Sequence, residues 1–168
     1  RALYRDGRAM LDEFGESMRA ASTGIDLLAV ARLTGDDLTT AERKVMTDYN
    51  FLVGAGETYY LSTLAAHLAR VIRDQRRDAE AASLLVTAER TAAEYDLDAQ
   101  VLWRSIRATI LARAGDTATA RQLAQYAADL AAQSQDPILR ADSLYELATV
   151  LSLAGDAAGA RSAAEGAV

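Results

Sequence analysis

Residues 115–120, GDTATA, return 40 positions later as residues 155–160, GDAAGA. Each segment begins with glycine and aspartate and has an alanine five positions after the glycine. Arg76 and Ala81 have the same spacing, with arginine in place of the glycine, and residues 35–41 form a fourth copy that contains one extra residue. Self-similarity at a fixed period near 40 predicts a repeat protein in which each unit is one helical hairpin.

Alanine also occupies equivalent places on both sides of each turn position. The recurring alanines are Ala69, Ala108 and Ala148 before the turn, and Ala81, Ala120, Ala160, Ala88, Ala127 and Ala167 after it. Because helical side chains return to the same face after about two turns, the alanines within each helix share one face. Small side chains let two helices approach closely, whereas Ile72, Leu111 and Leu151 fill the spaces between hairpins. We therefore expect the two helices of a hairpin to cross where both have alanine.

Helical periodicity covers the whole chain, so the sequence predicts an all-α fold, an α-α superhelix of antiparallel helix hairpins. The nine expected helices span residues 1–14, 17–34, 37–53, 59–74, 77–95, 98–114, 117–133, 137–153 and 157–168. Gly35, Gly115 and Gly155 can adopt the left-handed conformation that ends a helix, and the aspartate after each can cap the next helix. The pair Asp136-Pro137 predicts another helix start, because proline suits the first helical position.

Composition narrows the classes of function. The net charge of −6 and the pI near 4.8 disfavour nucleic-acid binding, which requires a basic surface. The chain has no cysteine and no apolar run long enough to span a bilayer, so we expect a cytoplasmic protein with no membrane partner. The gaps between helices are too short for a linker, so residues 1–168 are expected to form a single repeat domain. Since no initiator methionine is present, we expect this domain to be a fragment of a longer multidomain protein.

The alanine and glycine positions resemble the tetratricopeptide repeat, although the period near 40 exceeds the 34 residues of that family. Two segments are more specific: residues 56–68 (GETYYLSTLAAHL) and residues 98–115 (DAQVLWRSIRATILARAG), with the stretch Leu102-Trp103-Arg104-Ser105. They resemble the C-terminal helical repeats of large bacterial regulators that contain a signal-transduction ATPase and a nucleotide cyclase or another output domain. The resemblance implies a regulatory role in signal transduction, with any catalysis in the domains of the parent protein.

The residues themselves indicate no catalytic, metal or cofactor site. His67 is the single histidine and has no thiol or second histidine to complete a zinc site or a triad. Residues 53–57, VGAGE, have a G-x-G pattern but follow a helix and lack the lysine of a phosphate-binding loop, so we interpret them as a hairpin loop. We therefore expect a chain that is not an enzyme.

Four arginines are the candidate partner-binding residues. Arg70 and Arg73 lie on one first helix of a hairpin and Arg104 and Arg107 on the next, each pair at i, i+3 spacing. First helices line the concave face of a superhelix, so the four can form a groove for an acidic peptide or for another domain of the same chain. Solvated or locally paired arginines are the alternative interpretation.

Aromatic residues beside these arginines are further candidates. Tyr59 and Trp103 can act as anchors at the edge of the groove, since interfaces favour such rings, although packing into the core is the expectation we prefer for both. The last helix, 157–168, offers almost only alanine to its neighbours, so we expect it to be weakly anchored.

The leading hypothesis is a non-catalytic protein–protein interaction module that senses a protein or peptide. Structural self-association through exposed ends of the stack is the alternative, because a truncated solenoid leaves an apolar face open. A freestanding enzyme or an RNA-binding repeat would need convergent catalytic groups or recurring base-reading side chains, and the sequence contains neither pattern.

Overall fold

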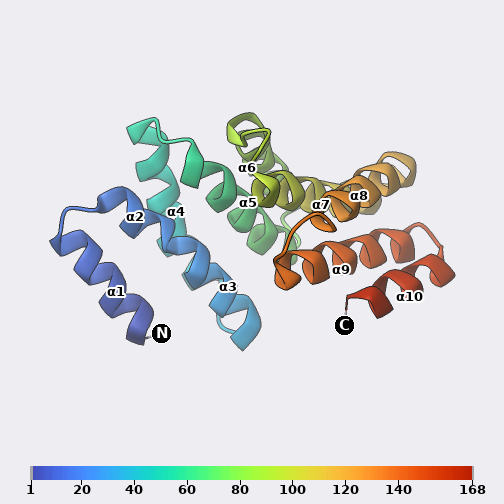
Figure 1. Cartoon of the computed structure of the whole chain (residues 1–168), viewed down its shortest axis with the longest axis horizontal. Coiled ribbons are helices and arrows are strands. Elements are labelled where there is room, and N and C mark those ends of the chain that lie inside the picture. Colours follow the sequence, from blue (N-terminus) through green and yellow to red (C-terminus); the bar gives the residue numbers. More distant parts are fainter. Residues whose placement is uncertain (1, 168) are drawn as a thin grey trace. The chain divides into compact units, whose positions relative to one another are not determined.

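The computed structural model describes residues 2–167, and this range is all-α, with ten helices and no strand (Figure 1). The helices are α1 Ala2–Glu13, α2 Ser17–Ser22, α3 Gly24–Thr34, α4 Leu38–Ala55, α5 Tyr59–Asp74, α6 Asp78–Thr91, α7 Leu97–Arg113, α8 Thr117–Ala131, α9 Pro137–Leu153 and α10 Ala157–Gly166. From α1 to α6, and again from α7 to α10, helices that follow one another in the sequence pack together, so the expected all-α hairpin architecture is confirmed. No helix within residues 2–167 has both the length and the apolar character that crossing a bilayer requires.

Three expected boundaries are wrong. The helix expected over residues 17–34 is divided at Thr23, so the described range contains ten helices where nine were expected. The helix expected over residues 77–95 ends at Thr91, and the chain then runs through a short connection to Asp96. Helix α4 continues to Ala55, so much of the segment 53–57 that was interpreted as a loop is helical, and the turn begins at Gly56.

The helix ends show why the turns lie where the repeat predicts them. Gly115 and Gly155 have φ angles of 93° and 79°, and the aspartate after each accepts a hydrogen bond from a backbone N–H of the following helix. Asp136 caps α9 in the same way. In the fourth copy of the repeat, residues 35–41, Asp37 caps α4 in place of the expected Asp36. The extra residue in this copy moves the start of the helix by one position.

Contacts divide the chain into two compact units, residues 1–92 and 93–168, and each is described here by itself. In the first unit, α4 and α5 pack against α3, and α6 packs against α5. Its core contains fully buried Leu28, Val45 and Leu64. Gly24 permits the close approach of α3, since a Cβ atom there would lie 2.9 Å from Cγ1 of Val45. The expectation of a single domain over residues 1–168 stays a prediction.

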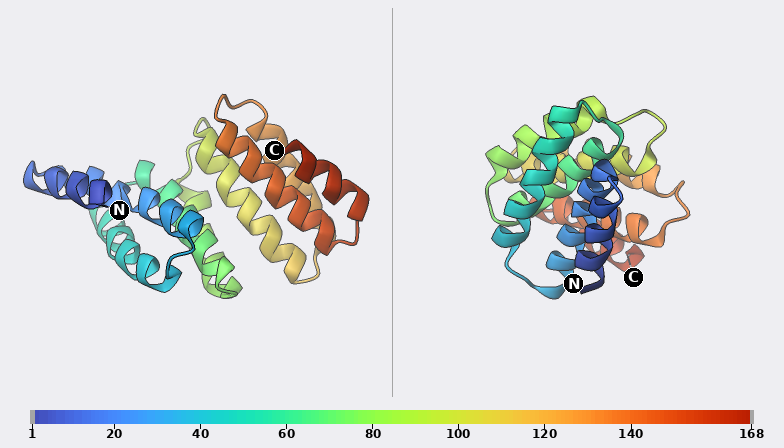
Figure 2. Two further views of the ribbon diagram at one scale, coloured as in Figure 1. Left: turned by 90° about the horizontal axis from the view of Figure 1, so that it is seen from below. Right: turned by 90° about the vertical axis from the view of Figure 1, so that its left-hand side faces the viewer.

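In the second unit, α7 packs against α8 and α9, and α9 also packs against α8 and α10 (Figure 2, left). Its buried cluster consists mainly of alanines, and three of them, Ala108, Ala120 and Ala148, are repeat alanines expected from the sequence. The buried cluster consists of Ala108, Ala112, Ala120, Ala124, Ala128, Leu147, Ala148, Val150 and Ala163. Helix α10 contributes only Ala163 to the buried residues that the structure describes. The expected small-residue crossing is therefore present between α7 and α8, whereas in the last hairpin the expected Ala160 and Ala167 are only partly buried and Ala163 packs instead.

Polar side chains also join successive hairpins within each unit. Arg77 on the α5–α6 connection donates to Glu42 on α4 at 2.7 Å, and Thr109 on α7 donates to buried Glu146 on α9 at 2.7 Å. These partners are separated by 35 and 37 residues in the sequence, which is close to one repeat. Residues in equivalent parts of neighbouring hairpins thus meet side by side.

Candidate functional site

Helix α7 begins at a capped turn that fixes the orientation of its first side chains. The Asp96 carboxylate accepts a hydrogen bond from the N–H of Ala99 at 3.1 Å. Gln100, one turn further along, donates from Nε2 to the carbonyl oxygen of Ala93 at 2.9 Å. The Gln100 side chain is therefore held against the connection that precedes α7, and its amide oxygen can accept hydrogen bonds from other side chains.

That amide oxygen organises a cluster of Trp103, Arg104 and Arg107. Trp103 Nε1 donates to Gln100 Oε1 at 3.4 Å, and Arg104 Nη1 donates to the same oxygen and to the Gln100 carbonyl oxygen, the latter at 2.8 Å. The Arg104 guanidinium carbon lies 4.1 Å from the centre of the Trp103 ring system, and that of Arg107 lies 4.9 Å from it. Both distances suit cation–π attraction.

Helix α8 adds Tyr126 to this cluster. The Arg104 guanidinium carbon is 5.2 Å from the centre of the Tyr126 ring, so the guanidinium contacts an aromatic ring of each helix of the hairpin. Trp103 is 6% exposed, whereas Tyr126 is 51% exposed. The buried indole therefore fixes the arginines, and the tyrosine presents a ring to solvent.

Two hollows of the second unit share Tyr126 as a wall. One, of about 310 Å³, is also lined by Leu97, Arg104 and Leu130, and the other, of about 450 Å³, by Arg121 and Leu147 among others. The first is also lined by Gln100 and by the carboxylate of Glu94, so its walls combine apolar groups with one cation and one anion. The apolar walls suit an apolar side chain, and a carboxylate beside it would be attracted on the Arg104 side, away from Glu94. We name Trp103, Arg104, Arg107, Tyr126 and the first hollow the α7–α8 surface.

Charge varies along the length of α7. At the start of the helix, burial together with the charges of Asp96 and Asp136 raises the pKa of Asp98 above its ordinary value. Acidic groups therefore crowd one another at that end, whereas Arg104 and Arg107 lie one to two turns further along. An acidic partner would be repelled at the helix start and attracted near Trp103.

The residues that the sequence predicts to bind a partner lie in different surroundings in the structure. Arg104, Arg107 and Trp103 come together in the second unit, and the preferred expectation that Trp103 packs in the core is confirmed. Arg70 and Arg73 lie on α5 of the first unit and are only 2% and 4% exposed, so neither presents an open surface. Binding by all four arginines in one groove stays a prediction.

Arg73 takes part in an ion-pair network within the first unit. Its Nη2 donates to Asp74 Oδ1 at 2.8 Å, and Arg32 Nε on α3 donates to Asp74 Oδ2 at 3.1 Å. Burial alone would raise the pKa of Asp74, but the two arginines outweigh that effect and hold the pKa below its ordinary value. The Arg32–Asp74 pair therefore joins α3 to α5, and Arg73 adds a second cation beside the same carboxylate.

Tyr59 does not pack into the core, so the expectation that we preferred for this residue is wrong. It is 62% exposed, because it is the first residue of α5 and its ring lies beyond the packed part of the helix. Its ring contacts Tyr60 edge to face, with 5.2 Å between the ring centres. Tyr59 is thus an exposed aromatic residue of the first unit, remote in sequence from Trp103.

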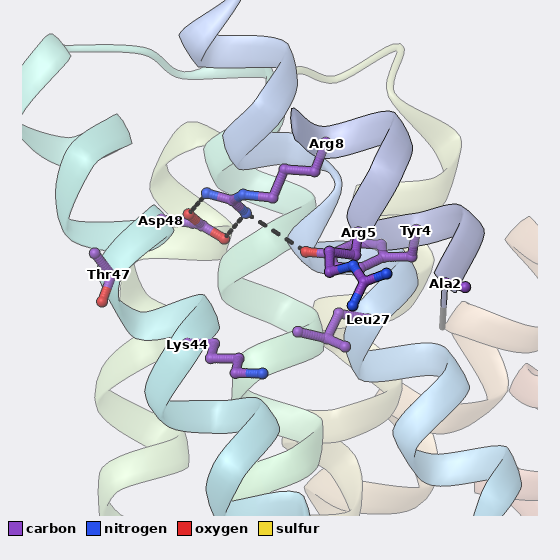
Figure 3. A pocket seen from close by; sticks show the side chains of 8 residues that line it. All are labelled: Ala2, Tyr4, Arg5, Arg8, Leu27, Lys44, Thr47 and Asp48. Carbon is purple, nitrogen blue, oxygen red and sulfur yellow. Dashed lines mark hydrogen bonds and ion pairs between the residues drawn. The ribbon is translucent and has the colours of Figure 1, made fainter. Parts of the chain in front are cut away.

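A further hollow, of about 610 Å³, lies in the first unit between α1, α3 and α4, and the sequence analysis did not predict it (Figure 3). Arg8 reaches from α1 to Asp48 on α4, with Nη1 and Nη2 donating to the two carboxylate oxygens at 2.7 and 2.5 Å. The hydrogen bonds to Asp48 raise the pKa of Arg8 above its ordinary value. The separation of 40 residues, one repeat, is the sequence signal that identifies this pair.

In comparisons with protein-family models, with curated proteins and with solved structures, nothing matches this chain. The resemblance to the repeat regions of bacterial signalling regulators therefore stays a prediction.

Proposed function

We propose that this chain is a protein-interaction module whose α7–α8 surface binds a peptide segment that places an apolar side chain beside an acidic one. The observation that supports this most is the position of the Arg104 guanidinium between the rings of Trp103 and Tyr126. An arginine held by stacking and by Gln100 loses little conformational entropy on binding, so its charge is presented in a fixed place.

The segment that fits has two features. Its apolar residue would enter the hollow between Leu97, Tyr126 and Leu130, and its carboxylate would lie near Arg104 and Arg107. Exposed tyrosine and fixed arginine are the residue types that contribute most binding energy at protein interfaces. The wider role that we propose is the sensing or scaffolding region of a bacterial signalling regulator, with a partner that is another protein or another domain of the same chain.

Titration calorimetry with synthetic peptides tests this proposal. The peptides place one leucine beside two glutamates, and matched peptides have lysine in place of each glutamate. We expect saturable binding of the acidic peptides only, and about tenfold weaker binding by Arg104→Glu, since a hydrogen bond to a charged group is worth ~1.5–3 kcal/mol. Tyr145→Ala is the control, because Tyr145 is an exposed tyrosine on α9 that lines neither hollow. Equal binding of acidic and basic peptides would contradict the proposal.

Self-association is a second candidate function, and helix α1 favours it. Leu3, Met10 and Phe14 are spaced by seven and four residues, lie on one face, and are 89%, 58% and 76% exposed. Light scattering over a range of concentrations separates the two candidates. Self-association through this face predicts a mass that rises with concentration and a Phe14→Glu variant whose mass does not.

A further inference from the structure

The hollow between α1, α3 and α4 has the size and the wall chemistry of a site for a small molecule. Its volume of about 610 Å³ lies within the range of roughly 300–1,000 Å³ that ligand pockets occupy. Ala2 and Tyr4 of α1 and Leu27 of α3 supply apolar wall, and Thr47 and Lys44 of α4 supply polar groups. Figure 3 shows these side chains around the same space.

Positive charge exceeds negative charge in this wall. Arg5, Arg8 and Lys44 line the hollow, and Asp48 is the one carboxylate among its lining residues. Asp48 is 4% exposed and is engaged by both terminal nitrogens of Arg8. Arg8 and Asp48 therefore compensate each other. The other positive groups of the wall are Lys44 and Arg5, and Arg5 also donates from Nε to Asp6 Oδ1 at 3.2 Å, which leaves its terminal nitrogens for a ligand.

The Arg8–Asp48 pair also fixes the shape of the hollow. Two parallel hydrogen bonds hold α1 at a defined distance from α4, and Arg8 Nη1 lies 3.5 Å from the Tyr4 hydroxyl, which orients the tyrosine ring. Such a bidentate pair is geometrically specific. The pair thus ties the α1 wall of the hollow to its α4 wall.

A smaller neighbouring hollow of about 240 Å³ determines which way a charged ligand would lie. Leu27 and Lys44 line both hollows, and Asp36 and Asp37 line only the smaller one. An anionic group is repelled from the end that contains these two aspartates. Its favourable position is beside Arg5 and Lys44, with an apolar body against Tyr4 and Leu27.

We propose that this hollow binds a small carboxylate with an apolar chain of medium length, such as a fatty acid of about eight carbons. The carboxylate accepts hydrogen bonds from Arg5 and Lys44, and the chain replaces water against the apolar wall. This proposal is independent of peptide binding at the α7–α8 surface.

Lys44 is the only lysine of the chain, which makes a direct test practical. Reductive methylation with ¹³C-formaldehyde labels Lys44 and the terminal amine, and the two signals separate in an NMR spectrum. Titration with octanoate is expected to shift the Lys44 signal saturably, whereas octylammonium, with the same chain and the opposite charge, is expected to leave it unchanged. Hydrogen exchange of α1 should slow at saturating octanoate, since the ligand joins α1 to α4.

Two variants locate the site by calorimetry. Arg5→Gln and Lys44→Gln are each expected to weaken octanoate binding about tenfold, because each removes a charge-assisted contact. Arg43→Gln is the matched control, since Arg43 is an exposed cation on α4 that does not line the hollow. The proposal is wrong if octanoate produces no saturable shift at Lys44, if octylammonium produces the same shift, or if Arg43→Gln weakens binding as much as Lys44→Gln.

Discussion

The second unit packs its helices mainly through alanine, whereas the first unit adds charged side chains to its core. Among the described residues, Glu42, Asp48, Arg70 and Arg73 are buried in the first unit, and Glu146 is the buried charged residue of the second. A buried charge is costly unless it is paired, so the first unit depends on exact pairing. Helical hairpins of one repeat length are therefore held together by two kinds of contact, small-residue packing and buried ion pairs, and each kind responds differently to substitution.

Overpacking the alanine crossing is expected to have the largest effect. Ala120 on α8 is completely buried against the second unit's core, so Ala120→Leu should lower the free energy of unfolding by about 3 kcal/mol, through the strain of extra volume. Ala118→Leu is the control, because Ala118 lies exposed on the same helix and should change stability little. Urea denaturation measures both. Equal effects of the two substitutions would contradict packing through small residues.

Removing the partner of a buried carboxylate tests the other kind of contact. Arg8→Met leaves the Asp48 carboxylate without its two hydrogen bonds and should cost about 2 kcal/mol, less than the ~3–5 kcal/mol of a fully buried pair because the Arg8 side chain is 29% exposed. Arg5→Met, at an 80% exposed side chain, should cost almost nothing. Denaturation curves, together with hydrogen exchange of α1, measure the stability of both variants. An Arg8→Met variant as stable as Arg5→Met would show that the pair does not hold α1.

Acid should weaken the first unit through Asp74. Its pKa is below the ordinary value of 3.8, so the stability it contributes is complete above that value and is lost as the pH falls through the lower pKa of the folded state. Asp74→Asn should therefore cost about 1 kcal/mol at pH 7, and the difference from the wild type should shrink below about pH 4. Thermal melts from pH 7 to pH 2.5 measure this. A difference that stays constant with pH would mean that the charge is not responsible.

The smallest expected effect concerns the irregular turn of the first unit. Arg76 has a φ angle of 65°, in the left-handed region where glycine is found at the equivalent Gly115. Relief of the ~1–2 kcal/mol that this conformation costs exceeds the ~0.5–1 kcal/mol of entropy that glycine loses, so Arg76→Gly should stabilise by about 0.5 kcal/mol. Gly115→Ala should destabilise the second unit. A destabilised Arg76→Gly variant would indicate that the arginine side chain contributes contacts of its own.

The sequence predicts the regular part of this structure because local rules determine it. Glycine turns, aspartate caps and alanine at fixed spacing place α7, α8 and α9 almost to the residue. The break at Thr23 was not predicted, although Gly24 directly follows it and begins α3. The need for glycine there is tertiary, since a Cβ atom at Gly24 would lie 2.9 Å from Cγ1 of Val45.

The sequence predicts the parts of the candidate sites that lie on one helix, but not the parts that depend on which helices are neighbours. Trp103, Arg104 and Arg107 lie within two turns of one helix, so helical spacing brings them together. Tyr126 and the Arg8–Asp48 pair require knowledge of which hairpins are neighbours. A search for opposite charges about one repeat apart would have found Arg8 with Asp48 and Arg32 with Asp74, which are 40 and 42 residues apart.

The most direct test of binding at the α7–α8 surface is the fluorescence of Trp103, the only tryptophan of the chain. A carboxylate that approaches Arg104 and Arg107 alters the field at the indole, so an acidic leucine-containing peptide should change the emission saturably. The change should weaken as salt rises and should require about tenfold more peptide in Arg104→Glu. Emission that stays constant up to millimolar peptide, or that changes equally in Arg104→Glu, would contradict the proposed function.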